Sequence, residues 1–316
     1  MENNKEFVFK LNQFKILYVN LDRRLDRRKN IEGELKRLGL KGTRISAIDG
    51  QSLTPDEQEY WMDRKNFNTL SRTPSKVFGR VGCYLSHLKL MKYALDNRIE
   101  PLLVLEDDCK FLTDRNDIEI RMPKNADIFY LGGLYWWKND ENKNDELDDF
   151  DGGSNPDMTF DNIKDHLYYD NYIQILPKYF RIACTFAYVL PTLEHIHNLF
   201  TTMLDVKKKA IDMMYVSYVQ KYENSYIIQP SLCVQSDQFT SDITDYGLKT
   251  PTNPYNNTYF FDNDIYTIPK VIEYYNKDYN KLIRRLLKYY KAKNLIPKPE
   301  RLFYHLQLVQ KDKYLQ

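Results

Sequence analysis

The chain has 316 residues, of which 42% are hydrophobic and 28% charged, and its 46 basic residues nearly balance 44 acidic ones. This length and composition predict a large α/β domain, alone or with an appendage, and exclude a globally disordered chain or one that binds polyanions over its whole length. No 18-residue apolar window and no apolar leader occur, which predicts a cytoplasmic protein without a membrane span.

The first third of the chain predicts a strand, a helix and a second strand. FKILYVNL (14–21) is a strand candidate, DRRLDRRKNIEGELKRLGL places apolar residues at helical spacing up to Gly39, and TRISAIDG (43–50) reads as the next strand and turn. This order is typical of a sheet with parallel strands. A longer helix is expected from Gly79 to Asn97, where apolar residues recur at three- and four-residue steps.

Further strands are expected in the middle of the chain, at 102–105, 126–133, 180–191 and 225–230, with a short helix at 211–222. Residues 134–170 are predicted to form a long irregular loop, because residues 138–165 hold ten Asp or Glu against three Lys. Trp136 and Trp137 at its start either meet a sugar ring or anchor the loop.

Turn residues near position 250 predict a boundary between a catalytic domain (1–250) and a basic helical extension (251–316). Residues 270–316 hold twelve Lys or Arg against four Asp or Glu. Tyrosines among these cations could stack on nucleic acid. The leucines in the same stretch favour packing on the domain itself or on a second subunit, so we expect no nucleic-acid partner and consider a homodimer.

Three carboxylates, Glu106, Asp107 and Asp108, directly follow the apolar run 102–105. Ligands of open α/β sheets bind at the carboxyl ends of strands, and three unpartnered like charges there would repel one another. A divalent cation with a preference for hard oxygen ligands, Mg²⁺ or Mn²⁺, would remove that difficulty. Residues i and i+2 of an extended segment share a face, so Glu106 and Asp108 could reach one ion. Taken alone, the triplet is also compatible with a solvated strand end.

The chain resembles glycosyltransferase family 25 in an ordered set of segments: NLDRRLDRRKNIEGELKRLGL, RISAIDG, GRVGCYLSHLKLMKYALDNRIEPLLVLEDDCKF, ADIFYLGG, FAYVLP and IDMMYVSYV. The resemblance covers roughly residues 14–245, and its most specific part is GCYLSH followed some twenty residues later by LEDD. That family includes procollagen galactosyltransferases and bacterial lipooligosaccharide galactosyltransferases. The resemblance implies a GT-A fold with a Rossmann-like sheet, a UDP-sugar donor and a divalent metal, usually Mn²⁺, at an acidic DxD-type motif.

The resemblance also implies roles for individual residues. Asp108 would be the principal metal ligand with support from Glu106, while Asp107 would meet the ribose or an arginine. The family's NLxxRxxR opening places Asn20 and Arg23 at the nucleotide, and its late SDT stretch makes Asp242 a metal or acceptor contact. Arg80 stands where an acidic residue is more usual in the family.

Asp212 and His87 each have two interpretations. Asp212 matches a family aspartate before a helix and is the candidate general base, although Asp in this position also N-caps helices well. His87 in GCYLSH is expected to be a hydrogen-bonded helix residue rather than a nucleophile, since spacing suggests no catalytic partner for it. The four cysteines contain no CxxC pair and are expected to be buried thiols in a reducing compartment.

The combined prediction is a metal-dependent, inverting transferase that uses UDP-galactose or UDP-glucose. Its acceptor would be a hydroxyl group, either of a glycan or of hydroxylysine in a collagen-like protein. The alternative is a catalytically inactive module that binds a sugar or nucleotide. Intact acidic residues at 106–108 favour the enzyme, because an inactive site has no reason to hold repelling charges together.

Overall fold

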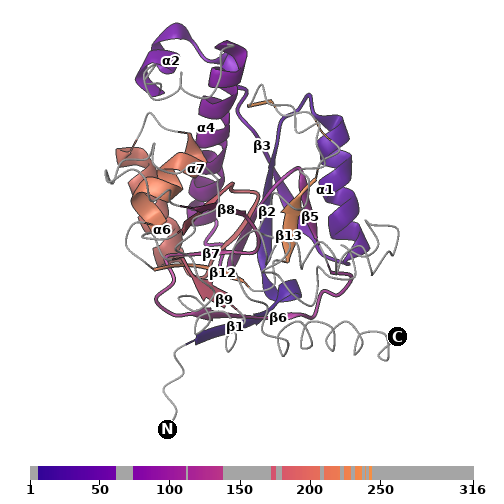
Figure 1. The fold of residues 1–316 in the computed structure, drawn as a ribbon. Coiled ribbons are helices and arrows are strands. Elements are labelled where there is room, and N and C mark those ends of the chain that lie inside the picture. Colours follow the sequence, from indigo (N-terminus) through magenta and orange to yellow (C-terminus); the bar gives the residue numbers. More distant parts are fainter. Residues whose placement is uncertain are drawn as a thin grey trace, which may run out of the picture.

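A computed structural model of the protein describes residues 6–61, 74–111, 113–137, 172–175, 180–206, 210–220, 224–228 and 232–236, with 239, 242 and 243. This part of the chain folds as a mixed α/β structure (Figure 1). The expected acidic loop beyond residue 137 and the basic extension from 251 lie outside the described residues. None of the helices in the described ranges is long and apolar enough to span a bilayer.

A seven-stranded mixed sheet forms the centre, in the order β3-β2-β4-β11-β7-β12-β9. Its strands are β2 (Lys15–Asn20), β3 (Gly42–Ser46), β4 (Leu102–Glu106), β7 (Ile128–Tyr130), β9 (Tyr172–Gln174), β11 (Ala187–Leu190) and β12 (Ser225–Ile228). Strand β2 runs parallel to β3 and β4, whereas β11 is antiparallel to both β4 and β7. The predicted parallel strand–helix–strand unit is therefore confirmed, within a sheet that is not wholly parallel.

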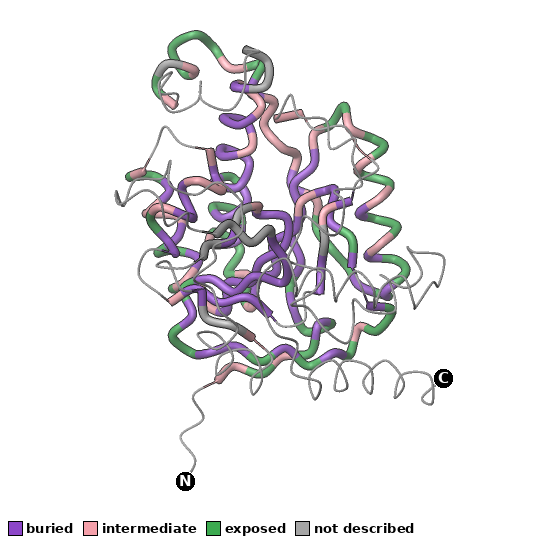
Figure 2. The backbone as a smooth tube through the Cα atoms, in the orientation of Figure 1, coloured by how far each residue is buried: buried purple, intermediate pink, exposed green. Residues whose placement is uncertain are grey.

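Apolar side chains on both faces of the sheet give the protein two cores, because successive strand residues point to opposite faces. In β2, Leu17 and Val19 join one core while Ile16 and Tyr18 join the other. Helices α4 (Pro74–Asp96), α6 (Leu193–Asp205) and α7 (Ile211–Met214), with the π-helical turn η4 (Tyr215–Val219), cover the first face. Helix α1 (Leu25–Arg37) covers the second (Figure 1). The central strands are accordingly buried, and α1 alternates buried and exposed positions (Figure 2).

Three antiparallel strand pairs and a few short helices surround this sheet. The pairs are β1 (Glu6–Lys10) with β6 (Glu119–Pro123), β5 (Cys109–Phe111) with β13 (Cys233–Gln235), and β8 (Leu134–Trp137) with β10 (Phe180–Ala183). The short helices are η1 (Leu11–Gln13), η2 (Gly50–Ser52) and α2 (Pro55–Trp61). The β5–β13 pair matters for function because it brings Gln235 opposite Cys109, next to the three carboxylates.

Two predictions about strands are wrong. Residues 134–137, expected to begin an irregular loop, form strand β8 and pair with β10. The segment 180–191, expected to be one strand, forms two, because Cys184 adopts a left-handed conformation (φ 72°) that turns the chain between β10 and β11. That turn lets β11 enter the main sheet beside β4.

Helix α4 lies unusually close to the turn that follows β3. A Cβ atom on Gly82 would lie 2.5 Å from the carbonyl oxygen of Ile48, and one on Gly50 would lie 1.7 Å from that of Phe78. Ser86 reinforces the contact, since its hydroxyl accepts a hydrogen bond from the Ile48 amide at 2.8 Å. Two glycines thus allow the helix and the turn to approach and together form one wall of a cleft.

Candidate functional site

A cleft lies at the carboxyl ends of β2 and β4. It encloses about 100 Å³ and opens to solvent. The two strands are adjacent and parallel, with Val19 opposite Glu106, so the residues that follow them emerge at the same edge of the sheet. Six of the seven predicted site residues line this cleft: Asn20, Arg23, Glu106, Asp107, Asp108 and Asp242.

Asp107 and Asp108 share one partly buried arginine. The Arg27 guanidinium lies 3.0 Å from Asp107 Oδ1 and 3.0 Å from Asp108 Oδ2. The side-chain amide of Asn20 donates to Asp107 Oδ2 at 2.8 Å, and that of Gln235 donates to Asp108 Oδ2 at 3.0 Å. Much of the repulsion expected from the sequence is therefore offset by Arg27 and two amides, and repulsion alone does not require a cation.

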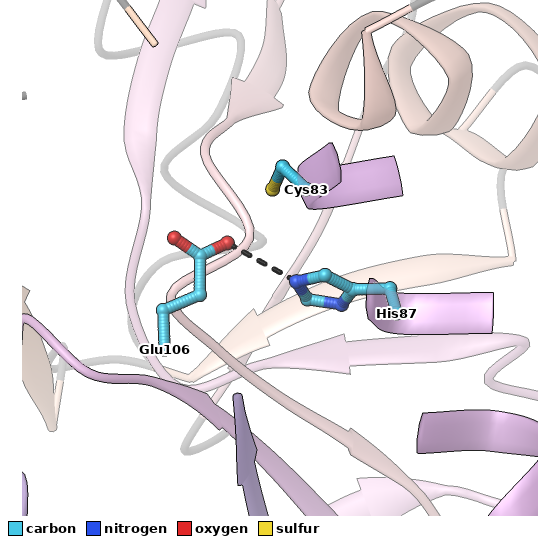
Figure 3. Close-up of side chains that lie close together, drawn as sticks. All are labelled: Cys83, His87 and Glu106. Atoms are coloured by element: carbon cyan, nitrogen blue, oxygen red, sulfur yellow. Dashed lines mark ion pairs between the residues drawn. The ribbon is translucent and has the colours of Figure 1, made fainter. Parts of the chain in front are cut away.

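Glu106 has different partners from its two neighbours. Its Oε1 lies 3.4 Å from His87 Nε2 and accepts a hydrogen bond from the Thr185 hydroxyl at 2.5 Å (Figure 3). Burial alone would raise the pKa of Glu106, but the interactions with His87 and Thr185 outweigh it and lower that pKa below its ordinary value. Glu106 is thus held ionised on the α4 side of the cleft.

Asp108 is the carboxylate whose charge is least compensated. Burial raises its pKa to about 7, and the negative charges of Glu106 and Asp107 act in the same direction against Arg27. Its Oδ1 atom is buried and has no hydrogen-bond partner among the described residues. A buried acceptor without a donor, flanked by two further carboxylates, is what a hard divalent cation would satisfy. Asp108 Oδ1 therefore offers one ligand atom suited to Mg²⁺ or Mn²⁺, while Glu106 and Asp242 do not form a three-ligand cluster with it among the described residues.

Cationic side chains crowd the mouth of the cleft, just after β2. Arg23 contacts Asp49 at 2.8 Å and Asp242 at 3.3 Å. Arg24, which the sequence did not single out, also pairs with Asp242 and with Asp26. Asp242 is thus held by two guanidinium groups, and the same groups lie where a diphosphate entering the cleft would find positive charge.

Asp212 lies in the first turn of α7 and does not line the cleft. It is not the N-cap, which is Ala210, and its carboxylate instead accepts a hydrogen bond from the Met213 amide at 2.8 Å. Burial raises the pKa of Asp212, with a further contribution from the charge of Glu106 and an opposing one from Arg80. An aspartate with a raised pKa is a better proton acceptor than an exposed one.

Arg80 connects α4 to the segment that carries Asp242. Its side chain is buried, and its Nε donates to the carbonyl oxygen of Ile243 at 3.2 Å. Ile243 lines the cleft. The basic residue that departs from the family pattern therefore helps to position the cleft wall.

His87 is buried and hydrogen-bonded, as expected, through Nδ1 to the Tyr188 hydroxyl at 2.9 Å. The side chains of Glu106 and Cys83 also lie close to His87. We expected no such partner from the spacing of residues in the sequence. A signal was present in the sequence, since Cys83 precedes His87 by four residues on a helix and must share its face. No comparable signal existed for Gln235, which reaches the site only through β5–β13 pairing.

The family model described as glycosyltransferase family 25 (LPS biosynthesis protein) matches residues 13–215, more than half of the chain. The mixed α/β fold with its polar cleft is thus matched to a family of glycosyltransferases. The chain is a member of glycosyltransferase family 25.

Curated relatives match shorter segments. Mouse procollagen galactosyltransferase 2 is 31% identical over 104 residues, which are 30% of this chain and 16% of the mouse protein. A protein of Acanthamoeba polyphaga mimivirus named as a glycosyltransferase, R655, is 33% identical over 103 residues, which are 32% of this chain and 30% of the viral protein. The human inactive glycosyltransferase 25 family member 3 is 27% identical over 132 residues, 37% of this chain and 21% of that protein. The matches thus span a small part of the relatives' length.

Proposed function

We propose that the protein transfers galactose or glucose from a UDP-sugar to a hydroxyl acceptor, with inversion, in the cleft at the ends of β2 and β4 of a GT-A type fold. The observation that carries the proposal is the convergence of six predicted site residues, from segments as far apart as Asn20 and Asp242, on one cleft. Membership of the family supports glycosyl transfer. Asn20 and Asp107 are proposed to hold the ribose side of the nucleotide, and Arg23 the diphosphate.

Asp108 would hold a Mn²⁺ or Mg²⁺ ion through its buried Oδ1, together with Glu106 through the oxygen that does not face His87. Asp242 is the third proposed ligand. The bound ion would offset the negative charge that develops on the departing diphosphate. Arg27 would help to hold these metal ligands in place. It pairs with Asp107 and with Oδ2 of Asp108, and it leaves Oδ1 of Asp108 without a hydrogen-bond donor among the described residues.

Asp212 is the proposed general base. The acceptor hydroxyl would give its proton to the Asp212 carboxylate as its oxygen bonds to the anomeric carbon of the sugar. The bond from that carbon to the diphosphate oxygen breaks in the same step, and UDP leaves with the bonding electron pair. The raised pKa of Asp212 supports this role.

The acceptor is proposed to be a glycan hydroxyl or a hydroxylysine in a collagen-like protein. The first follows the family description as an LPS biosynthesis protein, and the second follows the name of the mouse relative, procollagen galactosyltransferase 2. A sugar- or nucleotide-binding module without turnover is the competing proposal. Because the chain is similar to a human family member named as inactive, the experiment below also tests this second proposal.

UDP release from UDP-galactose and UDP-glucose tests the transferase. Simple sugars, hydroxylysine and water serve as acceptors, with Mn²⁺ or EDTA. We expect Mn²⁺-dependent release that falls at least 100-fold in Asp212→Asn, because the base is lost, while Asp212→Asn still binds UDP. Asp117→Asn, which removes an exposed carboxylate that does not line the cleft, is the control. If the protein binds UDP but releases no UDP from either sugar donor with any of the acceptors, the result would favour the inactive module.

A further inference from the structure

Cys83, His87 and Glu106 form a cluster with three different kinds of metal-ligand atom. The cysteine sulfur, one ring nitrogen and one carboxylate oxygen all lie within 4.8 Å of one another. Helix α4 supplies Cys83 and His87 on one face, and the end of β4 supplies Glu106 (Figure 3). Cys83 and Glu106 line the α4 side of the cleft, and Asp108 is not part of the cluster.

The His87 ring nitrogen that faces the cluster is buried, and its contact with Glu106 is longer than an ordinary hydrogen bond. His87 is completely buried, and its Nε2 has no hydrogen-bond partner among the described residues. The 3.4 Å between Nε2 and Glu106 Oε1 is well above the roughly 2.9 Å usual for an N–H···O hydrogen bond. It is close to the spacing of about 3.3 Å that a nitrogen and an oxygen have when both bind one tetrahedral Zn²⁺ at about 2.0–2.1 Å.

The groups behind the cluster orient its ligands. His87 Nδ1 is 2.9 Å from the Tyr188 hydroxyl, which is 3.0 Å from the Tyr215 hydroxyl. When Nδ1 carries the ring proton it donates to Tyr188, and Nε2 then presents its lone pair to the cluster. The Thr185 hydroxyl donates to Glu106 Oε1. Such hydrogen bonds from outside the ligand set are a regular feature of metal-binding histidines and carboxylates.

We propose that Cys83, His87 and Glu106 bind a divalent ion of the zinc class, at a site that shares Glu106, but not Asp108, with the proposed hard-metal site. Thiolate and imidazole ligands favour Zn²⁺ or Co²⁺ over Mg²⁺ or Mn²⁺. Cys83 and Glu106 both line the cleft, which gives the ion a route of entry. On binding, the Cys83 thiol loses its proton to solvent, and a fourth ligand position remains for water. The ion then fastens α4 to the end of β4.

Cobalt titration of the metal-free full chain tests this site directly. We expect one equivalent of Co²⁺ to produce visible d–d absorption and a near-ultraviolet thiolate-to-cobalt band, and Zn²⁺ to displace it. Cys83→Ser should abolish the thiolate band, and His87→Gln should weaken Co²⁺ binding at least tenfold. Cys184→Ala, which removes a different partly buried thiol, and Asp108→Asn should both keep the band.

The proposal is overturned if the folded wild type gives no thiolate-to-cobalt band, or if the band persists in Cys83→Ser. Circular dichroism establishes that each variant is folded. Should Cys83→Ser fail to fold, His87→Gln carries the test, and unchanged Co²⁺ affinity in that variant overturns the proposal. Failure of sugar transfer would leave the result unaffected, because the readout is binding of the metal alone.

Discussion

Three consecutive carboxylates occupy three different environments. Glu106 faces His87 and Thr185, Asp107 faces Asn20 and Arg27, and Asp108 shares Arg27 with Asp107. The sequence predicted that the three would gather in a cleft, because they follow a buried strand. It could not predict which partner each would take, since that depends on side-chain directions after the strand ends. Arg27, from helix α1, is the main counter-charge of Asp107 and Asp108.

The raised pKa of Asp108 predicts a pH-dependent effect of removing its charge in the metal-free protein. Burial raises the pKa of Asp108 in the folded protein to about 7, from an ordinary value of 3.8. Between these values the folded chain holds a proton that the unfolded chain has lost, so stability falls as pH rises toward 7. Asp108→Asn removes this loss. Its stabilising effect should be larger at pH 8 than at pH 5, by on the order of 2 kcal/mol.

Urea unfolding in EDTA at both pH values measures this difference. Asp117→Asn is the matched control, because Arg115 lowers the pKa of the exposed Asp117 and its replacement should bring no gain at pH 8. An equal change in the free energy of unfolding at pH 5 and pH 8 for Asp108→Asn would show that its charge is already compensated.

At the scale of elements, the spacing of apolar residues predicted the longer helices and strands. Strand β2, helix α1 and helix α4 follow from their apolar spacing, and Gly39 ends α1 with a φ of 63°, as glycine does after a helix. Strands β5 and β13 are three residues each, too short to show a period, and were missed. The break at Cys184 was missed for another reason: nothing in the mostly apolar segment FRIACTFAYVLP marks a left-handed residue.

The contact of α4 with the turn after β3 predicts opposite effects of the same substitution at two helical glycines. Gly33→Ala adds a methyl group to α1 where nothing lies within 4 Å, so it should stabilise the protein by about 0.5–1 kcal/mol. Gly82→Ala would place its methyl group 2.5 Å from the Ile48 carbonyl oxygen and 2.6 Å from the Gly50 nitrogen. It should destabilise by on the order of 1–3 kcal/mol and weaken UDP binding, because the wall of the cleft must move.

Thermal and urea unfolding measure the change in stability of both variants, and calorimetry measures their affinity for UDP. The close packing at Gly82 is refuted if Gly82→Ala is as stabilising as Gly33→Ala.

At the scale of the whole molecule, the parallel part of the sheet determines where the cleft lies. Strands β2, β3 and β4 run in one direction, so the polar residues that end β2 and β4 meet at one edge. The sequence predicted this half, because a helix joins β2 to β3. It did not predict that β11 would run antiparallel to β4, nor that Thr185, just before β11, would therefore reach Glu106. The carboxylates and the family were readable from the sequence, whereas the supporting residues come from strand order.

UDP binding measured by calorimetry tests most directly whether this cleft is the nucleotide-sugar site, because it requires no acceptor. Wild type, Asp108→Asn and the control Asp117→Asn are titrated in Mn²⁺ and in EDTA. We expect wild type and Asp117→Asn to bind one UDP at least tenfold more tightly in Mn²⁺ than in EDTA, and Asp108→Asn to lose that difference. Equal UDP affinity of wild type and Asp108→Asn in Mn²⁺, or no UDP binding by the folded wild type, would contradict the assignment of the cleft.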